Sequence, residues 1–97
     1  MTTGSKDEAR IIGRELVQSR LAACVNIFDN MNSFYMWEGK LQDDNEVVLV
    51  AKTTRKQVPK LIEKVKSIHR YDCPCIVSLP VIDGNPDFLR WIENEVD

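Results

Sequence analysis

Residues 32–41 form an alternating pattern in which large apolar side chains occupy both faces. In an extended strand, Phe34 and Met36 point to one side while Tyr35 and Trp37 point to the other. Aromatic and sulfur side chains on two faces need two separate layers of cover, and a short chain has little structure to supply the second. The pattern therefore predicts a strand that a partner subunit helps to bury.

A first helix is predicted from Ser5 to about Arg20. Ser5 and Glu8 have the spacing of a capping box, in which each side chain satisfies a backbone donor at the helix start. Apolar residues then recur at helical intervals, with polar residues mostly on the opposite side. The apolar positions are Ala9, Ile12, Leu16 and Val17.

Three strand-forming runs follow, and the last two, the aromatic strand and residues 46–52, predict a long hairpin from about residue 34 to residue 52. Residues 21–28 have the composition of a strand, and Asp29 with Asn30 provides either a turn or a bulge before the aromatic strand. Residues 43–45 are a further turn signal. Residues 46–52 form a continuous β-branched run, typical of a strand covered on both faces.

The second half of the chain predicts a helix, a strand and a last helix. The second helix should have its first full turn near Gln57 and not start at Thr54, because Pro59 is tolerated only near a helix start. Residues 75–81 predict a third strand, which lies at an edge because Pro80 cannot donate to a ladder. Asn85 is expected to cap a last helix that begins at Pro86.

The predicted order of elements is helix, hairpin, helix, strand, helix. It matches an α+β, ferredoxin-like β-α-β-β-α-β sandwich whose first strand is largely absent and which gains a C-terminal helix. Residues 1–97 are expected to form a single domain. Because the absent strand would lie in the middle of the sheet, three alternatives are open: the chain is shortened before Met1, residues 1–3 are a stub, or another subunit fills the gap.

Composition and charge exclude some classes of function and indicate a cellular compartment. Thirteen basic and fifteen acidic residues leave a net charge of -2, so no global field attracts nucleic acid or an anionic membrane. No secretory signal and no 18-residue apolar run is visible. An odd set of three cysteines, without regular spacing, is typical of free thiols in a reducing compartment. We expect a cytoplasmic protein that binds neither nucleic acid nor membrane.

His69, Cys73 and Cys75 form the pattern H-x3-C-x-C in a predicted loop that enters a strand. An imidazole and two thiols on one side of the chain could supply soft ligands to Cu(I) or Zn(II). A disulfide is unattractive, because cysteines two apart in a strand lie near the outer limit of Cα separation. In the competing interpretation, both thiols pack as small apolar groups and His69 forms hydrogen bonds at a helix C-terminus. Cys24 is expected to be a buried structural thiol.

A second candidate site is a cleft between subunits, with Trp37 as a stacking surface and Lys52 as a charge for an anionic ligand. The alternative is interface packing alone, with Lys52 paired to an acid such as Glu38. No carboxylate pair, triad or closed metal motif emerges, so we expect no enzymatic activity. The candidate cleft residues are Tyr35, Trp37, Glu38, Lys52 and Tyr71.

Four motifs in sequence order closely resemble the CutA family of divalent-cation tolerance proteins. They are RLAACVN at 20–26, YMWEGK at 35–40, HRYDCP at 69–74 and GNPDFL at 84–89. The resemblance extends from about Thr2 to Val96. It implies a ferredoxin-like fold, a cytoplasmic homotrimer, and binding of copper or another divalent metal ion.

Two departures from the family pattern limit what this resemblance implies. The first family strand lies almost entirely before Met1, so a metal-ligating cysteine that some members carry there has no counterpart. Cys75 also stands where glutamate commonly follows the proline. Of the proposed ligands, His69 alone matches the family directly.

The sequence thus predicts a non-enzymatic homotrimer that binds divalent or soft metal ions at clefts between subunits and acts in metal tolerance. One alternative is a trimeric small-molecule sensor similar to the PII proteins, although four scattered glycines provide no phosphate-binding loop. The other is a scaffold that anchors an unidentified protein partner and has no ligand.

Overall fold

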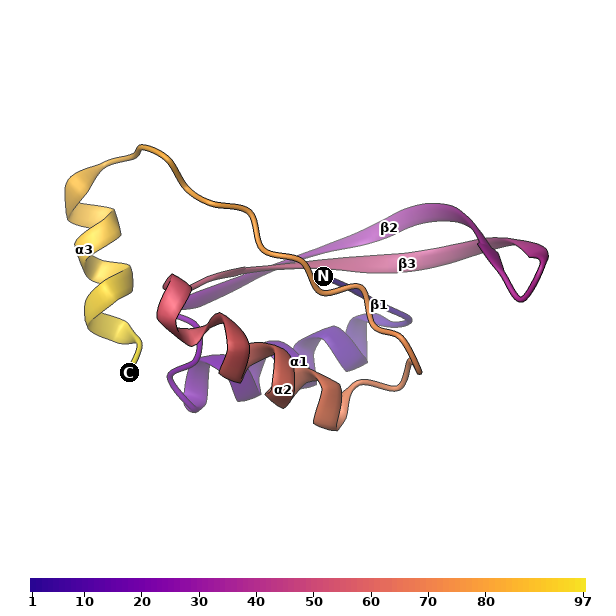
Figure 1. Cartoon of the computed structure of the whole chain (residues 1–97), viewed down its shortest axis with the longest axis horizontal. Helices are drawn as coiled ribbons and strands as arrows, with labels where there is room; N and C mark the ends of the chain where they lie inside the picture. The colour runs from indigo at the N-terminus through magenta and orange to yellow at the C-terminus, as the bar shows by residue number, and fades with distance from the viewer.

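The computed structural model describes residues 1–97 as a three-stranded antiparallel sheet with three α-helices. The strands β1 (Thr2–Thr3), β2 (Cys24–Trp37) and β3 (Lys40–Lys52) lie in the order β1-β3-β2. The helices α1 (Lys6–Gln18) and α2 (Val58–Ile68) both lie on one face of this sheet (Figure 1). The last helix, α3 (Pro86–Glu95), stands at the end of the molecule opposite the hairpin tip (Figure 1).

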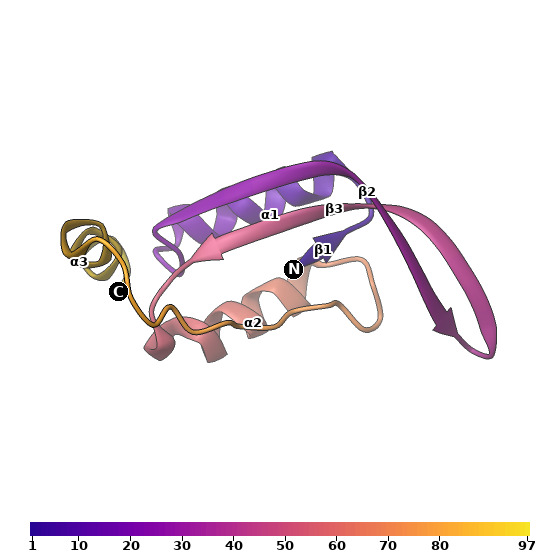
Figure 2. The same cartoon turned by 90° about the horizontal axis from the view of Figure 1, so that it is seen from above.

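Strands β2 and β3 form one long hairpin, which projects past α1 and α2 (Figure 2). Its turn is at residues 38–39, whose φ angles of 51° and 78° match the twist of the flanking strands. The turn predicted at residues 43–45 is therefore wrong, since these residues lie inside β3. The two aspartates of this run are tolerated there because Asn32 and Tyr35 donate hydrogen bonds to their carboxylates across the ladder.

Asp29 and Asn30 form a bulge within β2. Phe28 pairs with Val48 and Met31 pairs with Glu46, so two residues of β2 face one residue of β3. Asn30 has a φ of 65°, a conformation that asparagine tolerates better than most residues. Of the turn and the bulge proposed for this point, the bulge is confirmed.

Helix α1 begins as its capping pattern predicts, but only half of the box is present. The Ser5 hydroxyl accepts a hydrogen bond from the Glu8 backbone N–H at 3.1 Å. The Glu8 carboxylate does not return to Ser5 and accepts instead from the N–H groups of Gly4 (3.2 Å) and Arg70 (2.8 Å). This capping residue therefore also ties the start of α1 to the loop after α2.

The predicted starts of the other two helices are confirmed. A single 3₁₀ turn, Arg55–Gln57, leads into α2, which places Pro59 in the first turn of that helix. At α3, the Asn85 side chain accepts a hydrogen bond from the Asp87 N–H at 3.0 Å, and Pro86 occupies the first helical position.

The prediction of a third strand at residues 75–81 is wrong. These residues have no ladder partner, and Val77, Leu79 and Val81 are 71%, 84% and 70% exposed. Strand β1, the short stub, pairs only with β3. The segment has the right composition for a strand but no neighbouring backbone within the chain to pair with, and it runs across to α3 (Figure 1).

The core lies between the two packed helices and the inner face of the hairpin. The outer face is open within one chain, where Phe28 and Val50 are 59% and 40% exposed. The predicted cover on both faces of residues 46–52 is therefore not provided by the chain itself. The buried core residues are Ala9, Ile12, Leu16, Ala22, Val47, Leu49, Leu61 and Val65.

A smaller apolar cluster joins α3 to the base of β2, and it consists of Ala23, Ile92 and Val96. Arg20 adds polar contacts there, since its guanidinium donates to the Asp97 carboxylate and the Asn94 carbonyl. These contacts hold α3 against the end of the molecule. None of the helices combines the length and the apolar composition needed to cross a bilayer.

Two neighbouring isoleucines on α1 test this description of the core. Ile12 is fully buried, so Ile12→Ala should lower the free energy of unfolding by about 2 to 5 kcal/mol through lost burial and a cavity. Ile11 is 63% exposed, so Ile11→Ala should change it by less than about 1 kcal/mol. Urea denaturation at one fixed protein concentration measures both, and equal losses would contradict the assigned burial.

Candidate functional site

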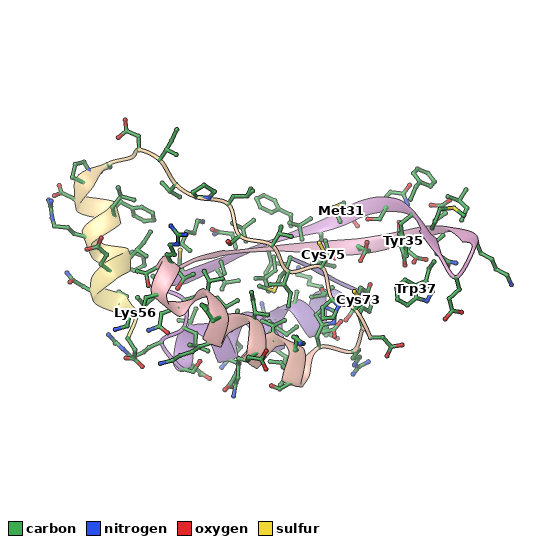
Figure 3. All side chains as sticks on the ribbon, viewed as in Figure 1. Met31, Tyr35, Trp37, Lys56, Cys73 and Cys75 are labelled. Atoms are coloured by element: carbon green, nitrogen blue, oxygen red, sulfur yellow. The ribbon has the colours of Figure 1, made fainter.

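A cavity of about 580 Å³ lies between the hairpin and the loop that follows α2. Its volume falls within the range typical of small-ligand sites. Figure 3 shows Tyr35 and Trp37 of β2 on the side of the hairpin that faces Cys73 and Cys75. The lining residues are Thr2, Ser33, Phe34, Tyr35, Trp37, Gln42, Glu46, Tyr71, Asp72, Cys73 and Cys75.

Cys73 and Cys75 both carry free, exposed thiols, and both line this cavity. Pro74, which lies between the two cysteines, is partly buried, and Ile76, which follows Cys75, packs against the main core. This alternation is expected of extended backbone, in which every second side chain shares a face. The loop therefore presents the two thiols on one side and secures itself to the protein with the other.

His69 does not line the cavity, and its side chain is fully buried. Nδ1 accepts a hydrogen bond from the Tyr71 backbone N–H at 3.0 Å, because that group can only donate. Nε2 lies 2.9 Å from the Thr2 carbonyl oxygen, which can only accept, so Nε2 carries the proton. Both ring nitrogens of the neutral imidazole are thus engaged, and His69 has no lone pair free for a metal ion.

The structure consequently does not bring His69, Cys73 and Cys75 together as a three-ligand group. No three histidine, cysteine or acidic side chains of residues 1–97 converge in a way that could hold a metal ion. His69 instead ends α2, where its backbone N–H donates to the Val65 carbonyl at 2.8 Å. This position agrees with the interpretation in which His69 forms hydrogen bonds at a helix C-terminus.

Glu8 fixes the start of the loop that carries the thiols. Its carboxylate is 7% exposed, accepts the Arg70 N–H, and lies 3.6 Å from Nδ1 of His69. The His69 ring packs against Tyr71 with ring centroids 4.7 Å apart. Sequence reasoning assigned Glu8 only a capping role, since no local pattern reveals a contact between residues 62 positions apart.

Two tyrosines at the cavity donate hydrogen bonds to carboxylates of β3. The Tyr71 hydroxyl donates a hydrogen bond to the Glu46 carboxylate at 3.1 Å. Burial of the phenol raises the pKa of Tyr71, and this hydrogen bond raises it further. The Tyr35 hydroxyl donates to Asp44, and that bond raises the pKa of Tyr35. Both phenols therefore stay protonated near neutral pH and act as donors, not as phenolate ligands.

Two of the five proposed cleft residues lie away from the cavity. Lys52 pairs with Cys24 at the base of the hairpin, where its ammonium donates to the Asn26 side chain. Glu38 lies at the hairpin turn, so within one chain it cannot pair with Lys52. Tyr35, Trp37 and Tyr71 do line the cavity.

The charge of the cavity lining is negative. Glu46 and Asp72 contribute carboxylates, and none of the eleven lining residues is a lysine or an arginine. Sequence reasoning named neither acid, although Asp72 adjoins Cys73 in the HRYDCP motif and could have been found there. Two thiols and two carboxylates around one hollow suit a cation better than an anion.

Comparison with known proteins gives close matches along the whole chain. A protein from Thermus thermophilus named divalent-cation tolerance protein CutA is 46% identical over 92 residues, which cover 95% of this chain and 89% of that protein. Longer relatives include a mouse CutA and a chloroplastic CutA of Arabidopsis thaliana. The aligned residues span 52% of the length of each of these two.

Solved structures match the fold equally well. The Cut A1 protein of Thermus thermophilus superposes with a TM-score of 0.96 at 44% identity, covering 99% of this chain and 93% of that one. A CutA of Archaeoglobus fulgidus, described as periplasmic, gives the same TM-score and coverage at 38% identity. The sequence model described as CutA1 divalent ion tolerance protein matches residues 1–95. The chain therefore belongs to the CutA1 divalent ion tolerance family.

Proposed function

We propose that this chain is a non-enzymatic homotrimer that binds soft or divalent metal ions, copper among them, in the cavity beside the hairpin, and so acts in metal tolerance. The observation that carries the proposal is the chemistry of the cavity: two free thiols and two carboxylates, with no basic side chain among the lining residues. Thiolates select soft ions such as Cu(I) over the hard ions of the cell.

The trimer is proposed because the hairpin exposes too much apolar surface for one chain. Phe34, Met36 and Leu41 are 67%, 63% and 68% exposed near its tip, and Trp37 on the other face is 46% exposed. Contiguous exposed apolar surface is typical of protein interfaces. Copies packed on the hairpin would also close the cavity, because Phe34 and Trp37 belong to both surfaces.

A second candidate is a small-molecule sensor of the PII type, and the aromatic lining favours it. Tyr35, Trp37 and Tyr71 surround a volume suited to a metabolite. The acidic lining counts against nucleotides, whose phosphates need cationic or backbone donors. A thermal-shift screen with nucleotides and neutral metabolites separates the candidates, because a ligand that binds only the folded state raises its unfolding temperature.

The cellular location follows from the thiol chemistry. Free exposed cysteines persist in a reducing compartment, so we propose the cytoplasm. A chemically inert scaffold for a protein partner is the remaining alternative. It would show neither metal uptake nor a ligand-induced shift in unfolding temperature.

Substitution at the hairpin tip tests the trimer. Phe34→Glu places a charge on the exposed apolar strip, and it should lower the mass measured by light scattering from three times 11.2 kDa towards that of one chain. Lys60→Gln on α2 changes the net charge by the same amount at an exposed polar position and should leave the mass unchanged. A wild type that runs as one chain at micromolar concentration would contradict the trimer.

The two tryptophans report where a metal ion binds. Trp37 lines the cavity, whereas Trp91 stacks on Phe88 in α3. Adding Cu(I) under anaerobic conditions should quench the fluorescence of Trp91→Phe, which retains Trp37, and leave that of Trp37→Phe nearly unchanged. The reverse pattern would place the ion near α3 and contradict binding in the cavity.

A further inference from the structure

We propose that Cys73 and Cys75 form a chelating dithiol that binds one soft, two-coordinate ion such as Cu(I) within each chain, without His69. The inference rests on the proposed metal-binding function and deepens it, since it names the ligands and the class of ion. It differs from the three-ligand pattern that the sequence suggests.

The first argument is the direction of the two thiols. Cys73 and Cys75 both line the cavity, while Ile76 packs against the core on the opposite side of the backbone. Pro74 between them fixes its own φ and removes one degree of freedom from the loop. At its start, the loop is held by the bond from the Arg70 N–H to Glu8 and by the bond from the Tyr71 N–H to His69. The pair is therefore presented by a supported loop.

The second argument is the spacing of the pair. Two residues of extended backbone separate the Cα atoms by about 6.6 Å. A disulfide needs sulfurs about 2.05 Å apart and usually a Cα separation below about 6.8 Å, so it lies at the limit of this geometry. An ion between two thiolates replaces the single S–S bond of a disulfide by two metal–sulfur bonds, so the sulfurs lie farther apart than in a disulfide. The spacing therefore suits a bridging ion better than a direct bond.

The third argument is that the other donors nearby are either engaged in hydrogen bonds or, like the Asp72 carboxylate, are hard oxygen ligands that a soft ion does not favour. Both nitrogens of His69 are engaged in hydrogen bonds, and the Glu46 carboxylate accepts a hydrogen bond from the Tyr71 hydroxyl. Zn(II) ordinarily requires four ligands in a tetrahedron, which the cavity does not assemble. Two thiolates alone satisfy an ion that accepts linear coordination, and soft thiolates favour Cu(I).

The binding step is an exchange of protons for metal. Two thiols release two protons to solvent and one Cu(I) forms two Cu–S bonds, giving a bis-thiolate complex of charge -1. No electron is transferred, and the ion enters and leaves as Cu(I).

Anaerobic titration with Cu(I), supplied from a chromophoric chelator that competes for the ion, tests the dithiol. We expect one ion per chain in the wild type. Cys73→Ser and Cys75→Ser should each weaken binding more than about 100-fold, because each removes one of two ligands. Cys24→Ser removes the remaining thiol, at the base of the hairpin, and should leave the affinity unchanged. Both serine substitutions at the site lie at exposed positions, and circular dichroism verifies that the variants are folded.

The outcomes separate this inference from the proposed function. If the wild type takes up none of Cu(I), Cu(II) and Zn(II), the metal-binding function itself falls, whereas uptake of the divalent ions without Cu(I) would overturn the dithiol alone. If Cys73→Ser and Cys75→Ser bind as the wild type does, the function stands and the dithiol is overturned. Zn(II) that competes equally with Cu(I) would overturn two-coordinate binding. Met36→Glu, at an exposed hairpin position outside the cavity lining, should still bind one ion per chain, and a loss of binding in this variant would overturn binding within one chain.

Discussion

The rest of the structure depends on the ladder between β2 and β3, because the helices of one chain cover only part of the ribbon that this ladder forms. Twelve residue pairs hold these strands together on either side of one bulge, and the ribbon they form extends past the helices that pack beneath it (Figure 2). Only the inner face near Val47 and Leu49 is buried by α1 and α2. The outer face and the tip keep their apolar side chains in water unless other chains cover them.

The same ribbon also makes the candidate site. Its twisted tip brings Tyr35 and Trp37 over the loop that follows α2, and the loop is held in place by the bonds that Glu8 and His69 accept. His69 thus acts as a structural support for the loop that presents the thiols. The residue that most resembles a metal ligand in the sequence is buried, with both ring nitrogens in hydrogen bonds, and the exposed thiols are the proposed ligands.

Much of this fold could be predicted from local patterns. The cap at Ser5, the position of Pro59 in the first turn of α2 and the cap at Asn85 depend on short-range backbone geometry, and all three are confirmed. The turn at residues 43–45 was wrong because hydrogen bonds across the ladder make aspartate acceptable in a strand. The prediction of a strand at residues 75–81 was wrong because a strand needs neighbouring backbone to pair with, and amino-acid composition does not show whether the fold supplies it. The site depends on contacts between distant residues, so its thiols and aromatic residues could be predicted from local patterns, but their separation from His69 and Lys52 could not.

Burial of the hairpin by other copies is the claim on which the proposed assembly and its closed cavity depend. Met36 is the most direct probe, because its thioether is oxidised by dilute peroxide at a rate set by solvent access, and one chain alone leaves the residue 63% exposed. Peptide mapping of the intact protein at micromolar concentration should find Met36 oxidised far more slowly than methionine in an unstructured peptide. Oxidation at the rate of the free peptide would contradict the account.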